Sequence, residues 1–185
     1  MSDEIYVIQA ISSGPYGYPY DEIVDIAVCC VDMNAHEFRT VYHNLIHFDP
    51  KVLGKKKLDY LAGAGGIFAE EIYSGEDEKK VAEEVLEIIK GKNITSFDVK
   101  QEFGRYMTCR PWDITLQSSV MPSISAKMPI SLKCKDPSDE AITIRKAYRR
   151  LCKDDPACVG RGRRAMHLAQ MASQLLLYMR DKGKY

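Results

Sequence analysis

The hydrophobic positions in the first third of the chain follow the pattern of an antiparallel sheet. Residues Tyr6 to Gly14 start as an apolar run and end in Ser12-Ser13-Gly14, which predicts a buried central strand whose end opens onto a crevice. Ile23 to Asp32 and Glu37 to His47 predict a second and a third strand. The short polar turn 33–36 between them favours a hairpin, so we expect the chain to begin as an antiparallel meander.

Helical spacing replaces this pattern in the middle of the chain. Residues Ser74 to Asp77 resemble a capping box, and the apolar residues that follow recur at helical spacing until Gly91. An amphipathic helix is therefore predicted, with its apolar residues at Val81, Val85, Leu86, Ile88 and Ile89. The segment Gly63-Ala64-Gly65-Gly66 lacks the Gly-Lys-Ser/Thr ending of a phosphate loop, and we interpret it as a flexible connector.

The second half predicts short strand segments separated by helices. A strand over Asn93–Phe97 is followed by a helix that Asp98 opens and that runs through Tyr106. Trp112–Thr115 has the pattern of another strand end. Two further helices are predicted from their apolar stripes. One is capped by Ser138 and buries Ile144, Ala147, Tyr148 and Leu151; the last runs from Arg163 to Arg180 and turns Leu168, Ala172, Leu175 and Met179 toward the sheet.

Length and composition fit one α/β domain over residues 1–185. With 45% hydrophobic and 28% charged residues, the chain can bury one substantial core. No apolar run approaches the ~20 residues of a membrane span, and the first residues are not a basic segment followed by an apolar one. We therefore expect a cytoplasmic protein without a membrane partner. The six cysteines form no CxxC pair, which favours reduced thiols.

The formal net charge of zero conceals an asymmetry along the chain. Residues up to Lys92 hold 9 Lys and Arg against 17 Asp and Glu, and the remainder hold 17 against 9. The basic clusters Arg145-Lys146, Arg149-Arg150 and Arg161–Arg164 could neutralise phosphates, or they could form a solvated helix face balanced by the acidic half. The tyrosines of the loop 14–20 could likewise stack on bases or pack as a rigid lid.

Few ionisable residues are placed to carry chemistry. His43 and His47 would stand too far apart on a strand, at ~3.3 Å per residue, to share an ion, so we interpret them as sheet-surface histidines. His167 falls on the polar side of the last helix, which favours a surface residue over a base. Asp98 has two interpretations: an N-cap that accepts backbone N–H bonds, or a carboxylate placed to hold a divalent ion.

Four segments, Val7–Gly14, Asp21–Ala27, Ser96–Val99 and Arg163–Ala169, follow one another in the order of known motifs. In that order and in local pattern they resemble the DEDD-type 3′–5′ exonucleases, a family that includes proofreading exonucleases and oligoribonuclease. The resemblance spans nearly the whole chain. It implies a ribonuclease H-like fold, with a mixed five-stranded sheet that begins as an antiparallel meander and is flanked by helices.

The same resemblance implies that the catalytic residues are mostly replaced. In the family, four carboxylates hold two metal ions and a histidine acts as general base. These positions fall on Gln9, Ile11, Asp98, Arg163 and Leu168, of which only Asp98 is a carboxylate. An amide and two aliphatic side chains do not supply the anionic oxygens that magnesium prefers. We therefore expect no intact catalytic set, no cofactor, and at most a weak metal contact at Asp98.

Three functional hypotheses follow from these residues. The first is a degenerate exonuclease-like domain without nuclease activity that still binds single-stranded DNA or RNA, through Ser12, Ser13, Gly14, Arg161, Arg163 and Arg164. The second is a protein-interaction or scaffold module, with a protein partner or a second copy of the chain. The third is an active Mg- or Mn-dependent exonuclease that uses other carboxylates, such as Asp25 and Asp113.

Overall fold

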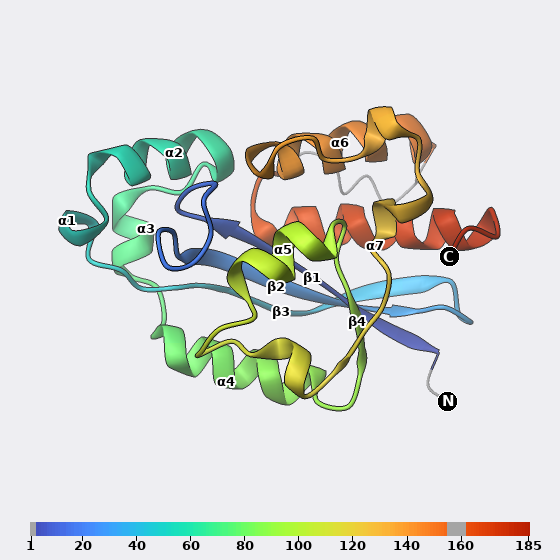
Figure 1. Cartoon of the computed structure of the whole chain (residues 1–185), viewed down its shortest axis with the longest axis horizontal. Coiled ribbons are helices and arrows are strands. Elements are labelled where there is room, and N and C mark those ends of the chain that lie inside the picture. The colour runs from blue at the N-terminus through green and yellow to red at the C-terminus, as the bar shows by residue number, and fades with distance from the viewer. Residues whose placement is uncertain (1–2, 155–161) are drawn as a thin grey trace.

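Figure 1 shows the chain as a computed structural model, which describes residues 3–154 and 162–185. Five strands form one mixed sheet in the order β3-β2-β1-β4-β5. Their bounds are β1 (Glu4–Ser12), β2 (Ile23–Asp32), β3 (Glu37–Leu45), β4 (Asn93–Thr95) and β5 (Ser119–Val120). β1, β2 and β3 are antiparallel, whereas β4 is parallel to β1 and β5 to β4. The predicted α/β class and opening meander are confirmed.

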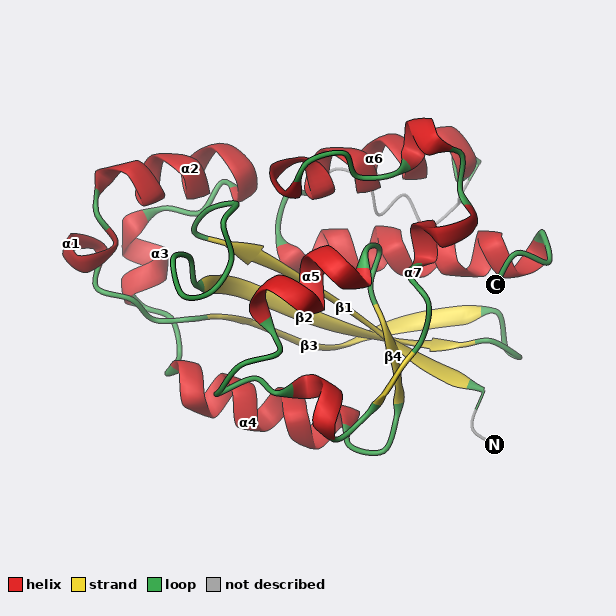
Figure 2. Ribbon diagram, viewed as in Figure 1, coloured by secondary structure: helices red, strands yellow, loops and turns green. Residues whose placement is uncertain are grey.

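Helices cover both faces of this sheet (Figure 2). The long helix α7 (Ala165–Asp181) packs on β1 and β2, and α6 (Glu140–Leu151) packs on α7. On the opposite face lies α4 (Glu78–Ile89). The remaining helices are α1 (Pro50–Leu53), α2 (Lys55–Gly65), α3 (Ala69–Tyr73) and α5 (Val99–Tyr106), with 3-10 turns at Ile114–Leu116, Ile124–Lys127, Ile130–Leu132 and Pro137–Asp139.

Burial on both faces explains the apolar pattern of the first strand. Successive side chains of a strand point to opposite faces, so Val7 and Ile11 join the core under α7 while Tyr6 and Ile8 join the core over α4. β2 is buried over nine of its ten residues for the same reason. The helix predicted after Asp77 is confirmed as α4. It begins there because the Asp77 carboxylate caps it by accepting the backbone N–H of Lys80 at 3.0 Å.

The glycine-rich segment is not a connector. α2 continues through Gly65, and Gly66 ends it with a left-handed φ of 63° and an N–H bond to the Ala62 carbonyl. A Cβ on Gly65 would lie 2.9 Å from Cδ1 of Ile11. The missing side chain therefore lets α2 approach β1 closely, and packing rather than flexibility accounts for this glycine.

Two further expectations from the second half are wrong. Trp112–Thr115 does not end a strand, because Asp113 adopts a left-handed φ of 35° and starts the 3-10 turn Ile114–Leu116. Ser138 does not cap α6; it lies in a 3-10 turn and donates its own backbone N–H to Asp136 at 3.0 Å. The third strand also stops at Leu45, two residues before its expected end.

Two features of the structure bear on expectations from the composition, namely the state of the cysteines and the length of the helices. Cys29, Cys30, Cys109 and Cys134 are free thiols, as expected, and Cys158 lies outside the described residues. Across the described part of the chain, none of the helices is both long enough and apolar enough to span a membrane.

Candidate functional site at the end of the first strand

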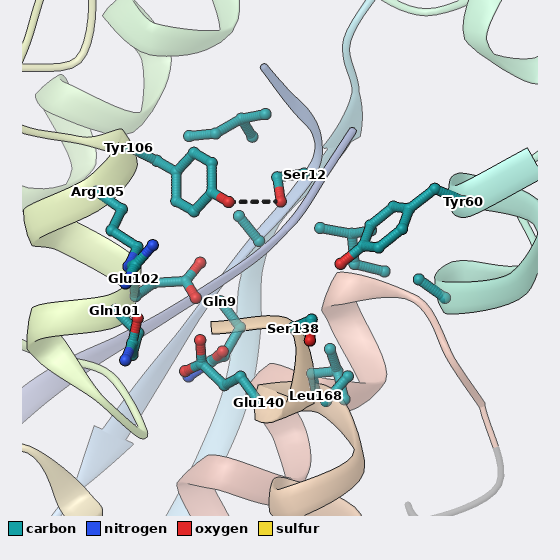
Figure 3. Close-up of a pocket in the computed structure, with 15 residues that line it drawn as sticks. Gln9, Ser12, Tyr60, Gln101, Glu102, Arg105, Tyr106, Ser138, Glu140 and Leu168 are labelled. Carbon is teal, nitrogen blue, oxygen red and sulfur yellow. Dashed lines mark hydrogen bonds between the residues drawn. The ribbon is translucent and has the colours of Figure 1, made fainter. Parts of the chain in front are cut away.

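A cavity lies beside the C-terminal half of β1, beyond the point where its pairing with β4 ends. β4 pairs with β1 only as far as Val7, so the β1 edge from Gln9 to Ser12 is left free on that side. Side chains from α2, α5, α6 and α7 close around this edge (Figure 3). They enclose a volume of about 60 Å³, which we name the β1 cavity. Its position at the carboxyl end of a central strand is the place where α/β sheets bind ligands.

Three of the positions that the sequence resemblance singled out line the β1 cavity. Gln9 and Ile11 are two residues apart on β1 and share a face, and Leu168 approaches them from α7. Gln9 is 1% exposed, and Ile11 and Leu168 are buried. At these three positions the cavity is therefore lined by one amide and two aliphatic side chains.

The other two positions lie elsewhere. Asp98 acts as the N-cap of α5, where its carboxylate accepts the backbone N–H groups of Lys100 at 3.1 Å and Gln101 at 3.2 Å. Its backbone N–H donates to the carboxyl of Glu140. Arg163 is exposed just before α7 and does not line the cavity.

A pair of carboxyls in the β1 cavity was missed by the sequence reasoning. Glu102 of α5 and Glu140 of α6 hydrogen-bond to each other, and the Ala10 backbone N–H also donates to Glu102. Glu102 is 4% exposed. Burial raises the pKa of Glu102 to about 7, and burial together with the charge of Glu102 raises the pKa of Glu140 well above its ordinary value. The two carboxyls therefore share a proton near neutral pH.

Part of this pair could have been found from the spacing of residues. Glu102 follows Asp98 by four positions, which puts both on one side of α5. Glu140 comes from an element 38 positions later, and nothing in the sequence indicates that it meets Glu102.

Unpartnered polar atoms gather in the same cavity. Within the described residues, Nε2 of Gln9, Oε1 of Gln101 and Oε1 of Glu140 are buried without a hydrogen-bond partner, and all three residues line the β1 cavity. Because buried polar groups are normally bonded, the cavity offers both donors and acceptors to a small polar group.

The carboxylates considered for an alternative metal site do not meet in the cavity. Asp25 is fully buried on β2, where its two oxygens bind Nε2 of His43 at 2.8 Å and the backbone N–H of Ala165 at 2.9 Å. Asp113 lies in a different loop, 3.9 Å from Arg110. Among the described residues, no three His, Cys, Asp or Glu side chains are arranged to hold a metal ion.

The loop after β1 forms its hydrogen bonds internally. Oγ of Ser12 donates to the Gly14 carbonyl at 2.7 Å, and Oγ of Ser13 donates to Glu22 at 2.7 Å. A Cβ on Gly14 would lie 2.4 Å from the Asp21 carboxylate, so carboxylates line this turn. Its serine hydroxyls are therefore engaged within the protein.

The predicted arginines divide into paired and unpaired groups. Arg164 donates to Glu71 at 2.6 Å and to the Gly66 carbonyl at 3.0 Å, which ties α7 to the α2–α3 segment. Arg163 is exposed and has no ion pair with a described carboxylate, and Arg161 lies outside the described residues.

Exposed tyrosines stand on the loop beside the cavity. Tyr16, Tyr18 and Tyr20 are 69%, 57% and 71% exposed. The loop is anchored to α5, because Arg105 accepts the Tyr18 N–H at its carbonyl and donates a guanidinium N–H to the Pro15 carbonyl. The three tyrosines thus stand on an anchored backbone and are exposed to solvent.

Comparisons with known proteins bear on the fold. No protein-family model and no curated protein sequence matches the chain. Solved structures do match. The nuclease domain of 3′hExo, a DEDDh family member bound to rAMP, is 13% identical at a TM-score of 0.59, over 98% of this chain and 94% of that one. Cell-death related nuclease 4 (CRN-4) is 16% identical at 0.62, over 98% and 64%. E. coli exonuclease I in complex with a dA16 oligonucleotide is 10% identical at 0.59, over 97% and 41%.

The chain spans less than two thirds of several of these proteins, including 62% of a full-length 3′-exonuclease. At such identities the likeness concerns the fold. The chain therefore has the exonuclease-like, ribonuclease H-like α/β fold of the solved 3′-exonucleases.

Proposed function

We propose that this chain is an exonuclease-like domain that binds single-stranded nucleic acid without cleaving it. The observation that carries the proposal is the composition of the β1 cavity. It is lined by Gln9, Ile11 and Leu168, which the sequence resemblance aligns with carboxylates of the family. Two-metal cleavage needs several anionic oxygens around the scissile phosphate. The aliphatic pair supplies none.

The two carboxyls that remain in the cavity do not restore this charge. Glu102 and Glu140 bond to each other and share a proton, so the pair carries less than two negative charges near neutral pH. Asp98 is engaged as the N-cap of α5. A hard divalent cation gains little from such a set of ligands.

Binding of nucleic acid is supported by the surroundings of the cavity. Solved structures of this fold contain rAMP or a dA16 oligonucleotide. In this chain, three exposed tyrosines beside the cavity offer ring faces for base stacking. Arg163 adds an unpaired positive charge near the start of α7.

A paired assay tests cleavage and binding separately. End-labelled single-stranded DNA and RNA, incubated with the protein and Mg²⁺ or Mn²⁺, should keep their full length. Fluorescence anisotropy should show binding that weakens as salt is raised. Metal-dependent shortening from the 3′ end that Asp98→Ala abolishes would show an active nuclease. Absence of binding even at low salt would leave a protein-interaction module as the function.

Restoring carboxylates to the β1 cavity should create metal binding. The triple variant Gln9→Asp, Ile11→Glu, Leu168→Asp places three carboxylates on one cavity. We expect Mn²⁺ to raise its melting temperature, by an amount that grows with the Mn²⁺ concentration, while the wild type responds less. Circular dichroism verifies that the variant folds, and Gln9→Asp alone is the matched control. A folded triple variant that ignores Mn²⁺ would show that these positions do not form a metal site.

A further inference from the structure

A row of cationic side chains follows one face of α6. Arg145, Lys146, Arg149 and Arg150 recur at spacings of three and four residues, so they lie on the same side of the helix. Together with Ile142, which is 68% exposed, they line an open groove of about 540 Å³. We name these four residues the α6 basic face. The opposite side of α6, with Ile144 buried, packs toward α7.

No carboxylate of the described residues pairs with the α6 basic face. Some lysines on other helices do pair with carboxylates, for example Lys55 with Asp59 at 2.5 Å and Lys80 with Glu76 at 2.6 Å. The four cations of α6 thus lack the direct carboxylate partners that these lysines have.

Arg145 gives a second, independent observation that points to an anionic ligand. Its guanidinium Nε is buried and has no hydrogen-bond partner among the described residues. Burial and the positive charges of Arg163 and Arg149 lower the pKa of Arg145, so like charges are crowded at this point. A bound anion with several acceptor oxygens would satisfy the Nε–H and relieve this repulsion.

The α6 basic face lies on the same helix whose first two residues line the β1 cavity. Glu140 and Ala141, the first two residues of α6, line the cavity, and the groove begins at Ile142. In Figure 3 the start of α6 stands beside Gln9 and Leu168. From residue 142 to residue 150 the helix rises about 12 Å at about 1.5 Å per residue. This length accommodates about three phosphates at the roughly 3.4 Å per-strand spacing of duplex DNA, and fewer in an extended strand.

We propose that the α6 basic face binds the phosphate backbone of a single strand that passes the mouth of the β1 cavity. This inference rests on the proposed function and extends it from the cavity to a second surface. Phosphates fit this surface because three of the four cations are arginines, whose planar guanidinium groups pair with phosphate in a bidentate manner. The regularly spaced phosphates of a nucleic-acid strand also match a linear row of cations better than a compact anion does.

Charge reversal tests this surface with oligonucleotides of two lengths. The variant Lys146→Glu, Arg149→Glu, Arg150→Glu changes three exposed side chains and keeps the half-buried Arg145. The probes are fluorescein-labelled oligothymidylates and oligouridylates of 5 and 20 nucleotides. We expect the variant to bind a 20-mer at least 10-fold more weakly than the wild type and a 5-mer within about 3-fold. The slope of log K against log salt should fall by about 2, because each lost phosphate contact contributes about 0.7 on single strands.

A second variant controls for overall charge. Lys51→Glu, Lys90→Glu, Lys184→Glu makes the same change in net charge at exposed positions outside α6 and should keep most of the 20-mer affinity. The inference is overturned if both variants lose the same 20-mer affinity, or if the α6 variant loses none. In either case the proposed function still stands, because the wild type binds the oligonucleotide. A wild type that binds neither length would overturn both, and would point to an acidic protein as the partner of α6.

Discussion

The Glu102→Gln variant will be more stable than the wild type at pH 8, by about 3 kcal/mol, and the two will differ little at pH 5. Glu102 is buried beside Glu140, with a pKa raised to about 7 from an ordinary value of 4.5. A neutral amide of the same shape removes the cost of ionising this buried group. The expected effect is therefore a difference in unfolding free energy that grows with pH.

The sign follows from proton binding in the two states. Between about pH 4.5 and 7 the folded protein keeps the Glu102 proton, and the unfolded chain has lost it. The folded state then binds more protons, so stability falls as pH rises. The stabilisation due to the shared proton is fully present below the unfolded pKa and is lost as pH rises through about 7. The raised pKa of Glu140 acts in the same direction.

Urea unfolding at pH 5, 6, 7 and 8 measures the free energy of unfolding of the variant and of the wild type. In the difference between the two values, the contributions of groups that titrate equally in both proteins cancel. His167, whose burial lowers its pKa, is one such group. Glu87→Gln makes the same chemical change on an exposed position of α4 and is the matched control. A Glu102→Gln difference that stays constant from pH 5 to pH 8 would rule out a shared proton at this pair.

Replacing Asp25 will strongly destabilise the protein. Asp25→Ala should cost about 3–5 kcal/mol of unfolding free energy, because it leaves the buried Ala165 N–H and the partly buried His43 without their carboxylate. Asp25 is fully buried, and its oxygens hold His43 on β3 and the backbone N–H of Ala165 at the start of α7. One side chain thus joins β2, β3 and the helix that covers them.

Asp25→Asn separates shape from charge. The amide can still accept one hydrogen bond, but its NH₂ group cannot accept the second, so we expect a cost of about 1–3 kcal/mol. His43→Gln removes only the histidine partner, whose side chain is 31% exposed, and should cost less than Asp25→Ala. Thermal unfolding followed by circular dichroism measures all three. A melting temperature for Asp25→Ala within 2 °C of the wild type would show that the carboxylate does not hold α7.

Local signals in the sequence determined most of the elements of this fold. Strands β1 and β2 follow from side chains buried on both faces, and α4 and α5 begin where Asp77 and Asp98 cap them. The apolar stripe of the last helix placed Leu168 toward the sheet, where it now lines the β1 cavity. These features depend on neighbours within a few residues, and a sequence displays such neighbours directly.

Only the tertiary structure decided what the cavity contains and how the charges are arranged. Glu102 and Glu140 come together from α5 and α6, Asp25 on β2 binds the start of α7, and Gly65 allows the close approach of α2 to Ile11. The same packing ties Arg164 to Glu71 and leaves the α6 basic face unpaired. Each of these contacts joins residues far apart in sequence, and their burial and mutual charge exist only once the helices have packed on the sheet.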